Sequence, residues 1–127
     1  MKTLLRALVG LSGLLSIVMV LGLWFGMERI LPAIGLMTND LAGGLVGRAT
    51  VRADIAGLFG GMGLAMLIAA TRESRAWAGA ALLFVSVALA GRLIGLALDG
   101  APAEVIPPIV IEAFTVALLA SYRARLT

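Results

Sequence analysis

The sequence predicts an all-α fold: an integral membrane bundle of four helices arranged as two helical hairpins. The chain has 127 residues, of which 61% are hydrophobic and only 13% are charged, and its mean hydropathy is +1.10. Soluble domains average about 45–50% apolar and about 25% charged residues. The hydrophobic residues number about 77, close to the roughly 80 that four membrane spans need. The remaining residues suffice for loops and tails but not for a soluble domain.

The first span is expected over residues 7–25, after the basic residues Lys2 and Arg6. A cleaved signal peptide is the alternative, because it also begins with a basic region. The apolar run is long for a signal core, and residues 26–29 do not form a small-x-small cleavage site. We therefore expect an uncleaved span and a single domain that covers residues 1–127.

Residues 27–50 form a mixed segment. Glu28 and Arg29 end the first span, and Pro32 prevents the helix from continuing. The apolar residues around Leu36 are too few for a span, so an interfacial turn or short helix is expected there. The polar residues 38–40 indicate the cap of a new helix.

Three further spans follow in quick succession. The second is expected over residues 51–70 and ends at a tight polar loop, residues 71–75. The third is expected over residues 76–98, before the turn signal at residues 99–102. The fourth is expected over residues 106–122, where Pro107 suits a first helical turn. Such short connections predict antiparallel neighbours.

Basic residues set the expected orientation. The side of the membrane with both termini and the loop 71–75 would hold Lys2, Arg6, Arg72, Arg75, Arg123 and Arg125. The other side would hold only Arg29 and Arg48, with Arg52 near its edge. The positive-inside rule then places both termini in the cytoplasm of a bacterium, with the chain in its inner membrane. Trp24 is expected at the outer interface, and Trp77 and Tyr122 at the inner one.

The residues that the chain lacks exclude several chemistries. It has no Cys and no His, which excludes disulfides, thiolate metal sites and Cys–His or Ser–His–Asp catalysis. Zinc, haem and iron–sulfur functions are disfavoured for the same reason, so we expect no metal and no cofactor. The net charge is +3, but the ten Lys and Arg residues are scattered rather than clustered, which argues against a nucleic-acid partner.

The informative residues are the charges inside the spans, because each costs a few kcal/mol in a membrane. Three are not at helix ends: Asp54, Arg92 and Glu112; a fourth, Asp99, lies at the outer mouth of the third span. At about 1.5 Å per residue, Arg92 lies roughly 10 Å below Asp99. Asp54 is about one turn inside its span and Glu112 one to two turns inside. All three therefore fall in the outer half of the bilayer.

Helical periodicity assigns these charges to faces. Arg92 and Asp99 share a face, and Arg92 lies between Gly91 and Gly95. Asp54 shares a face with glycines at positions 57 and 61, a pattern that lets membrane helices approach closely. Asp54 is therefore expected to point into a tightly packed interior, with Gly57 and Gly61 packing within the chain or, alternatively, in a homodimer. Arg52 is expected to extend outward to the headgroups.

Two interpretations of the charged cluster stay open. Arg92 can neutralise Glu112 or Asp54 in an ion pair that only fixes helix register. Alternatively, the cluster forms a polar pocket open to the periplasmic side that binds a small amphiphile, a lipid headgroup or a polar group of a partner.

Two sequence blocks and one acidic residue resemble a known bacterial family. The blocks are RADIAGLFG at residues 52–60 and GRLIGLALDGAP at residues 91–102, and the acidic residue is Glu112. In that order they resemble the family catalogued as domain of unknown function 4345, whose members are small four-span membrane proteins. The resemblance covers most of the chain and implies the fold but no established activity. It marks five polar positions: Arg52, Asp54, Arg92, Asp99 and Glu112.

Three functions fit these observations. The first is a non-enzymatic accessory or binding protein that engages a membrane lipid, a larger membrane complex or a second copy of itself. The second is a small proton-coupled transporter with Glu112 or Asp54 as the coupling group, although an arginine counter-charge would keep these carboxylates ionised. The third is a membrane enzyme acting on a lipid or quinone, with carboxyl groups as acid and base. We expect the first, and no catalytic residue is assigned.

Overall fold

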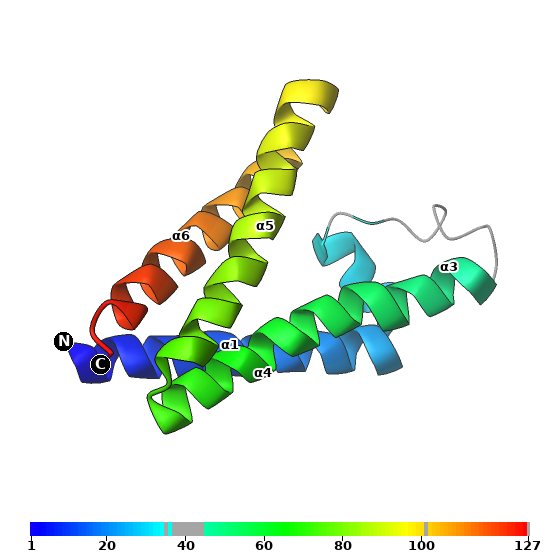
Figure 1. The fold of residues 1–127 in the computed structure, drawn as a ribbon. Coiled ribbons are helices and arrows are strands. Elements are labelled where there is room, and N and C mark those ends of the chain that lie inside the picture. The colour runs from blue at the N-terminus through cyan, green and yellow to red at the C-terminus, as the bar shows by residue number, and fades with distance from the viewer. Residues whose placement is uncertain (35, 37–44, 101, 127) are drawn as a thin grey trace.

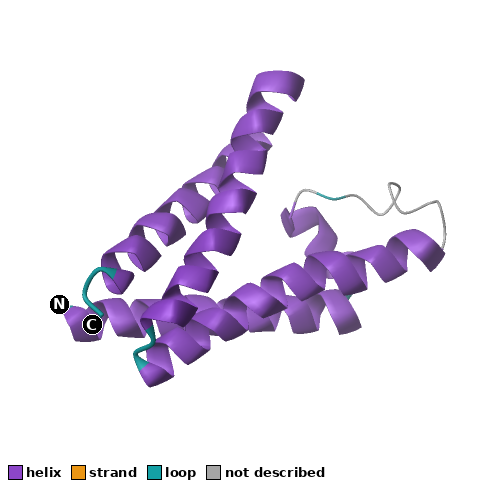
Figure 2. Cartoon of the chain, in the orientation of Figure 1, coloured by secondary structure: helices purple, strands orange, loops and turns teal. Residues whose placement is uncertain are grey.

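The computed structural model describes residues 1–34, 36, 45–100 and 102–126, and every regular element in them is helical (Figures 1 and 2). Four helices are long and apolar enough to cross a membrane, as a multi-pass membrane protein requires. Two of them are α1 (Lys2–Phe25) and α5 (Arg75–Asp99). The other two are the continuous helical stretches Gly47–Arg72, which contains α4 (Ala56–Arg72), and Ala103–Arg123, which contains α6 (Ile106–Arg123). Four long apolar helices thus lie where the sequence predicts spans, with ends that differ by a few residues.

Shorter helical pieces complete the fold. Helix α2 (Met27–Ile30) and the 3-10 turn η1 (Leu31–Ile34) follow α1. The α1 helix therefore ends before Gly26, and the chain is helical again through Pro32, where the sequence predicted that the helix stops. Helix α3 (Leu45–Thr50) and a single π-helical stretch, η3 (Val51–Ile55), lead into α4, and the 3-10 turn η4 (Ala103–Val105) precedes α6. The helix cap expected at residues 38–40 lies outside the described residues.

Helices α1 and α4 form the first hairpin, and their backbones meet where two glycines face each other. A Cβ atom added to Gly63 would lie 2.9 Å from Ser16 Cβ and 3.0 Å from the carbonyl oxygen of Gly13. One added to Gly13 would lie 2.8 Å from the carbonyl oxygen of Gly63. Small residues at such a contact let dispersion forces hold membrane helices together, since burial from lipid supplies no hydrophobic gain.

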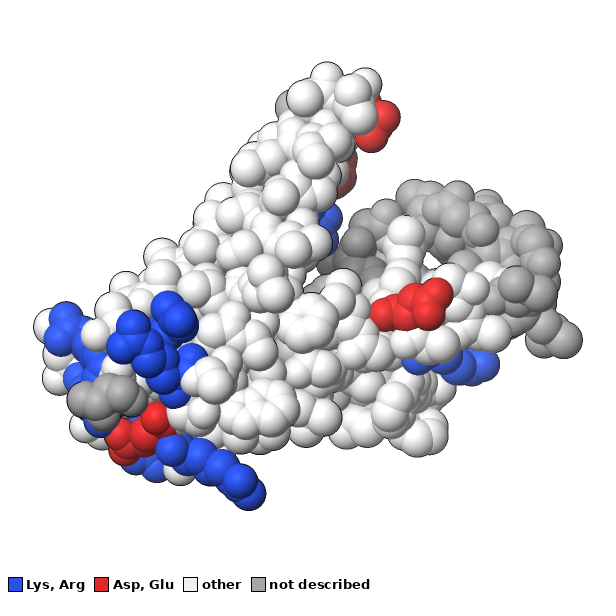
Figure 3. Space-filling model, viewed as in Figure 1, with Lys and Arg blue, Asp and Glu red and all other residues white. Residues whose placement is uncertain are grey.

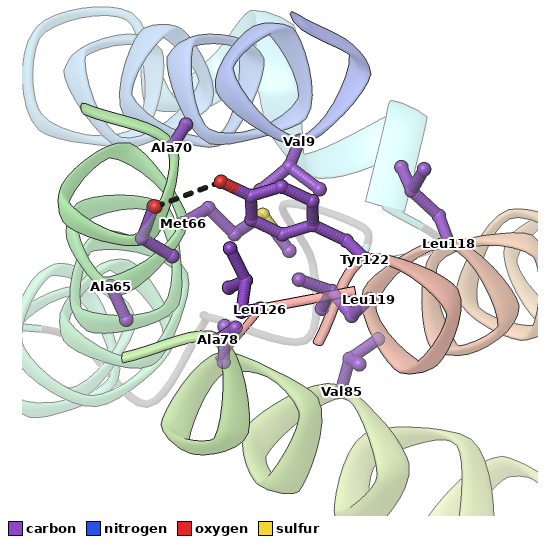
Figure 4. Packing of buried hydrophobic residues seen from close by; sticks show 12 residues of the cluster. Val9, Ala65, Met66, Ala70, Ala78, Val85, Leu118, Leu119, Tyr122 and Leu126 are labelled. Atoms are coloured by element: carbon purple, nitrogen blue, oxygen red, sulfur yellow. Dashed lines mark hydrogen bonds between the residues drawn. The ribbon is translucent and has the colours of Figure 1, made fainter. Parts of the chain in front are cut away.

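Helices α5 and α6 form the second hairpin, which joins the first at the end that carries both termini (Figure 1). The core there packs small residues of α4 and α5 against larger ones of α6 (Figure 4). Tyr122 is fully buried in it, and its hydroxyl donates a hydrogen bond to the carbonyl oxygen of Ala69, 3.1 Å away. Tyr122 was expected at the membrane interface, but this carbonyl gives its hydroxyl a partner inside the protein.

Basic side chains gather at the same end (Figure 3). The connection between α4 and α5 is as short as expected: Glu73 adopts a left-handed backbone conformation with φ of 50°, and the Ser74 side chain caps α5. The carboxylate of Glu73 binds Lys2 Nζ at 2.5 Å and Arg6 Nη1 at 2.7 Å. Lys2 and, to a lesser degree, Arg6 hold the pKa of Glu73 below its ordinary range. These contacts tie α1 to the loop, and we call this the closed end.

The two hairpins diverge toward the opposite, open end (Figure 1). There the first hairpin has its own small core, in which Leu23 and Leu31 are fully buried beside Val51 and Ala56. An ion pair between Glu28 and Arg48 closes it. This core contains only residues of the first hairpin, so it does not join the two hairpins at the open end. The facing sides of the hairpins therefore border a cleft there.

Candidate functional site

A cleft of about 300 Å³ lies between the two hairpins, and all four long helices line it. We call it the deep cleft. Its walls are mostly apolar and include Met19 of α1, Phe59, Met62 and Met66 of α4, and Ile111 of α6. Its volume is at the lower end of the range of small-molecule pockets, about 300–1,000 Å³, and such pockets are typically apolar with a few polar groups.

A second cleft, of about 490 Å³, continues toward the open end, and we call it the mouth. It shares Phe59, Arg92 and Glu112 with the deep cleft. Its other lining residues include Gly91, Gly95 and Asp99 from α5. The two clefts therefore adjoin around these shared residues. The inner cleft is mostly apolar away from the junction, and the mouth adds a third charge, Asp99.

Arg92 and Glu112 form an ion pair where the two clefts meet. Arg92 Nε donates a hydrogen bond to Glu112 Oε1 at 2.7 Å, across the interface of α5 and α6. The side chains remain 32% and 14% exposed, respectively. The sequence left open which carboxylate pairs with Arg92, and the structure selects Glu112 because the two residues lie on facing sides of one hairpin.

The pair does not satisfy all of its own polar atoms. Glu112 Oε2 is buried and has no hydrogen-bond partner within the part of the chain that the structure describes. Of the five N–H donors of a guanidinium group, Arg92 uses one in a hydrogen bond to a described residue. A buried polar atom without a partner costs about 1–3 kcal/mol, so this ion pair is not fully satisfied within the described chain.

Of the three hydroxyl groups that line the deep cleft, those of Ser16 and Thr115 are already occupied as donors. Ser16 Oγ donates to the carbonyl oxygen of Ser12 at 3.0 Å, and Thr115 Oγ1 donates to that of Ile111 at 2.7 Å. Both bonds run one turn back along their own helix. The deep cleft therefore offers acceptor oxygens, the hydroxyl group of Ser12 and apolar surface, and its guanidinium group lies at the junction with the mouth.

The other predicted site residues divide into two groups. Asp99 lines the mouth with Arg92 and Glu112, as expected from their shared face. Asp54 lines neither cleft: it is exposed and forms no ion pair with a described residue. Arg52 is exposed, as expected, and its carbonyl oxygen accepts a hydrogen bond from Trp24 Nε1 at 3.1 Å. The expected cluster thus forms without Asp54.

The glycine stripes also differ from expectation. Atoms added at Gly57, Gly61 or Gly91 would meet nothing within 4 Å among the described residues, so these glycines do not pack against another helix of the chain. Gly57 and Gly61 do share an exposed face with Asp54, but that face points away from the bundle. Gly63 makes the close contact with α1 instead, and Gly91 and Gly95 form part of the mouth wall.

One feature was missed in the sequence. Residues Val51–Ile55, in the span that carries Arg52 and Asp54, form a π-helical stretch. Such stretches are rare and occur often at functional sites. The one related sequence signal is Trp24, because an indole N–H at the end of a span needs a hydrogen-bond acceptor. Its acceptor is the main-chain carbonyl of Arg52 in this stretch, and a main-chain group has no sequence signature.

Comparisons with protein-family models, with curated proteins and with solved structures find no match to this chain. Among the described residues, no group of three or more Asp, Glu, His or Cys side chains lies close enough to hold a metal ion. The chemistry that the site offers is that of the two clefts and the three charges that line them.

Proposed function

We propose that the protein is a membrane accessory or binding protein that holds an amphiphile between its two hairpins. The observation that carries this proposal is that the mostly apolar deep cleft adjoins a mouth that carries additional charge. An amphiphile has the same two parts in the same order. Its chain would lie against Met62 and Met66, and its head would lie near Arg92 and Asp99.

The position of the ion pair supports a role beyond fixing helix register. An ion pair that only fixed helix register would be most stable with every polar atom hydrogen-bonded, because each buried polar atom without a partner reduces its contribution to stability. The Arg92–Glu112 pair instead lies at the junction of two clefts, with a carboxylate oxygen that has no partner in the described chain. The remaining N–H donors of Arg92 are the groups that a ligand in the clefts can reach.

The cellular setting is part of the same proposal. The charge bias that gathers six basic residues at the closed end favours a cytoplasmic position for both termini, in a bacterial inner membrane. The mouth would then open on the periplasmic side. We also retain, as a proposal, the relation to the four-span family that the two sequence blocks resemble.

Native mass spectrometry of the protein, released from membranes in mild detergent, tests the binding function. We expect the wild type to retain an amphiphile at a stoichiometry of one per chain. Ser12→Phe places a bulky ring in the deep cleft and should abolish retention. Ser121→Phe is the matched control, because Ser121 is exposed and lines neither cleft. A wild type without a bound amphiphile, or equal retention by both variants, would contradict the proposal.

A second variant tests whether the ion pair contributes to binding. Changing Arg92→Gln and Glu112→Gln together removes both charges and leaves neither one unpaired. We expect this double variant to keep the helix content of the wild type by circular dichroism and to lose most of the bound amphiphile. Unchanged retention in a folded double variant would show that the pair is only structural.

A further inference from the structure

Arg92 brings unused N–H donors to the junction of the two clefts. Among the described residues that line either cleft, no other side chain carries an N–H group. Arg92 Nε donates to Glu112 Oε1 at 2.7 Å, and the remaining donors belong to the Nη atoms. The side chain is 32% exposed, and its Nη atoms are not among the buried polar atoms without a partner. A ligand at the junction can therefore accept hydrogen bonds from Arg92.

An anionic head is disfavoured at this junction because the positive charge of Arg92 is already balanced. The carboxylate of Glu112 is ion-paired with it, so a second anion would add a negative charge without a counter-charge. Asp99 contributes a further carboxylate to the mouth. The two clefts are thus lined by one guanidinium group and two carboxylates, and together these charges repel an anion.

A cationic head finds no strong partner that it can reach inside the clefts. Glu112 Oε1 is engaged by Arg92, and Glu112 Oε2 has almost no accessible surface for a ligand to touch. Asp99 is exposed at the end of α5. Its attraction for a cation is weak there, because solvent screens exposed ion pairs. The accessible hydrogen-bonding groups at the junction are therefore the donors of Arg92.

From these observations we infer that the amphiphile has an uncharged head that accepts hydrogen bonds from the Nη groups of Arg92. A carbonyl group is the simplest such head, since its oxygen has two lone pairs and carries no charge. The inference rests on the proposed function, because it names the class of ligand for the same cleft. The apolar chain lies in the deep cleft and the carbonyl group at the junction. A single-chain ketone and the ester group of a membrane lipid share this head chemistry.

Methionine methyl groups provide a direct readout of the bound chain. Met19, Met62 and Met66 line the deep cleft, while Met1 and Met27 line neither cleft. The protein, carrying ¹³C-methyl methionine, is placed in nanodiscs of ether-linked phosphatidylcholine, which has no ester carbonyl. It is titrated with tridecan-2-one, tridecane, dodecyl sulfate and dodecyltrimethylammonium. We expect tridecan-2-one to shift the cleft methyl signals, to leave those of Met1 and Met27 unchanged, and to bind at least about tenfold more tightly than each other probe.

Ester-linked phosphatidylcholine in the nanodisc distinguishes the two sources of the head. If the site takes the ester group of a membrane lipid, adding this lipid alone shifts the cleft methyl signals and raises the tridecan-2-one concentration needed. If the site takes single-chain carbonyl compounds, the lipid has no effect while tridecan-2-one still binds. Either result supports the inference of an uncharged acceptor head and assigns its source.

A double variant tests the role of Arg92. Changing Arg92→Leu and Glu112→Leu together removes the donors and leaves no buried charge unpaired, and such replacements are often neutral for stability. We expect this variant to bind tridecan-2-one only as tightly as tridecane, because leucine donates no hydrogen bond to the carbonyl oxygen. Arg52→Leu is the matched control, because Arg52 is exposed and lines neither cleft. A double variant that keeps the preference for the ketone, or a control that loses it, would overturn the assignment of Arg92.

The possible failures are distinguishable. If neither the probes nor the ester-linked lipid shift the cleft methyl signals, the proposed function itself fails. If tridecane or either charged probe binds the wild type as tightly as tridecan-2-one, the cleft does hold apolar chains but the inference of an uncharged acceptor head is wrong. This comparison uses the wild type alone, so it decides the inference even where the double variant does not fold.

Discussion

The substitution Gly63→Ala should destabilise the first hairpin. The added Cβ atom would lie 2.9 Å from Ser16 Cβ and 3.0 Å from the carbonyl oxygen of Gly13, whereas carbon atoms in good contact are about 3.5–4.0 Å apart. The helices must therefore separate by roughly half an ångström or more. Overpacking of this kind costs about 1–3 kcal/mol of unfolding free energy.

Gly61→Ala is a matched control two residues away on the same helix. An added Cβ atom at Gly61 meets nothing within 4 Å among the described residues. Both substitutions gain the same intrinsic helix propensity, so the difference between the two variants measures the steric clash alone. We expect Gly63→Ala to be less stable than Gly61→Ala by about 1–3 kcal/mol.

Unfolding by sodium dodecyl sulfate in mixed maltoside micelles, followed by far-ultraviolet circular dichroism, provides the comparison. Equal unfolding free energies for the two alanine variants would refute the close contact between α1 and α4. A less stable Gly61→Ala variant would indicate that the exposed stripe at Gly57 and Gly61 packs after all, against a second copy of the chain.

Two further predictions concern the closed end. Tyr122→Phe should lower the unfolding free energy by about 0.5–1.5 kcal/mol. We expect the smaller value because the Ala69 carbonyl oxygen also accepts a hydrogen bond from the Ser74 N–H at 3.2 Å. The same sodium dodecyl sulfate titration measures this change, and a variant as stable as the wild type would contradict it. Lys2 holds the pKa of Glu73 below its ordinary range, so the ion pairs of Glu73 stabilise the folded state above an ordinary glutamate pKa of about 4.3 and are lost as the pH falls through the lowered folded value. Thermal midpoints measured between pH 6 and about pH 3 should therefore fall more in the wild type than in Glu73→Gln, and parallel curves would count against this assignment.

The sequence predicts the fold well because a membrane restricts the choices. Four apolar runs of spanning length, separated by short polar loops, admit few arrangements other than two antiparallel hairpins. The polar loop at 71–75 and the turn at 99–100 fall where the helices end. The π-helical stretch before α4 was not predictable, since its residues are ordinary span residues and only its main-chain hydrogen bonding sets it apart.

The sequence predicted how deep the charged residues lie in the membrane, but only partly which way their side chains point. Counting residues placed Arg92 and Glu112 in one slab of the membrane, and they do form an ion pair. Which face of α4 packs against α1 was ambiguous, because its glycines form small-residue stripes on two faces. The stripe with Gly63 makes the contact, so Asp54 on the other stripe points outward.

The divergence of the two hairpins has no signature in a single helix. It depends on the large core around Tyr122 at the closed end and on the separate core around Leu23 in the first hairpin. Periodicity shows which residues share a face but not how far apart two facing helices lie. The clefts therefore emerge only from the packing of all four helices.

Photo-crosslinking of a bound amphiphile tests most directly whether the cleft is the binding site. A single-chain amphiphile with a diazirine in its chain is added at one equivalent per protein chain, and the labelled residues are mapped by mass spectrometry. The cleft residues Phe59 and Met62 should be labelled, and the same amphiphile without the diazirine should suppress that labelling. Labelling confined to the lipid-exposed residues Leu83 and Val87, or insensitive to the competitor, would contradict binding between the hairpins.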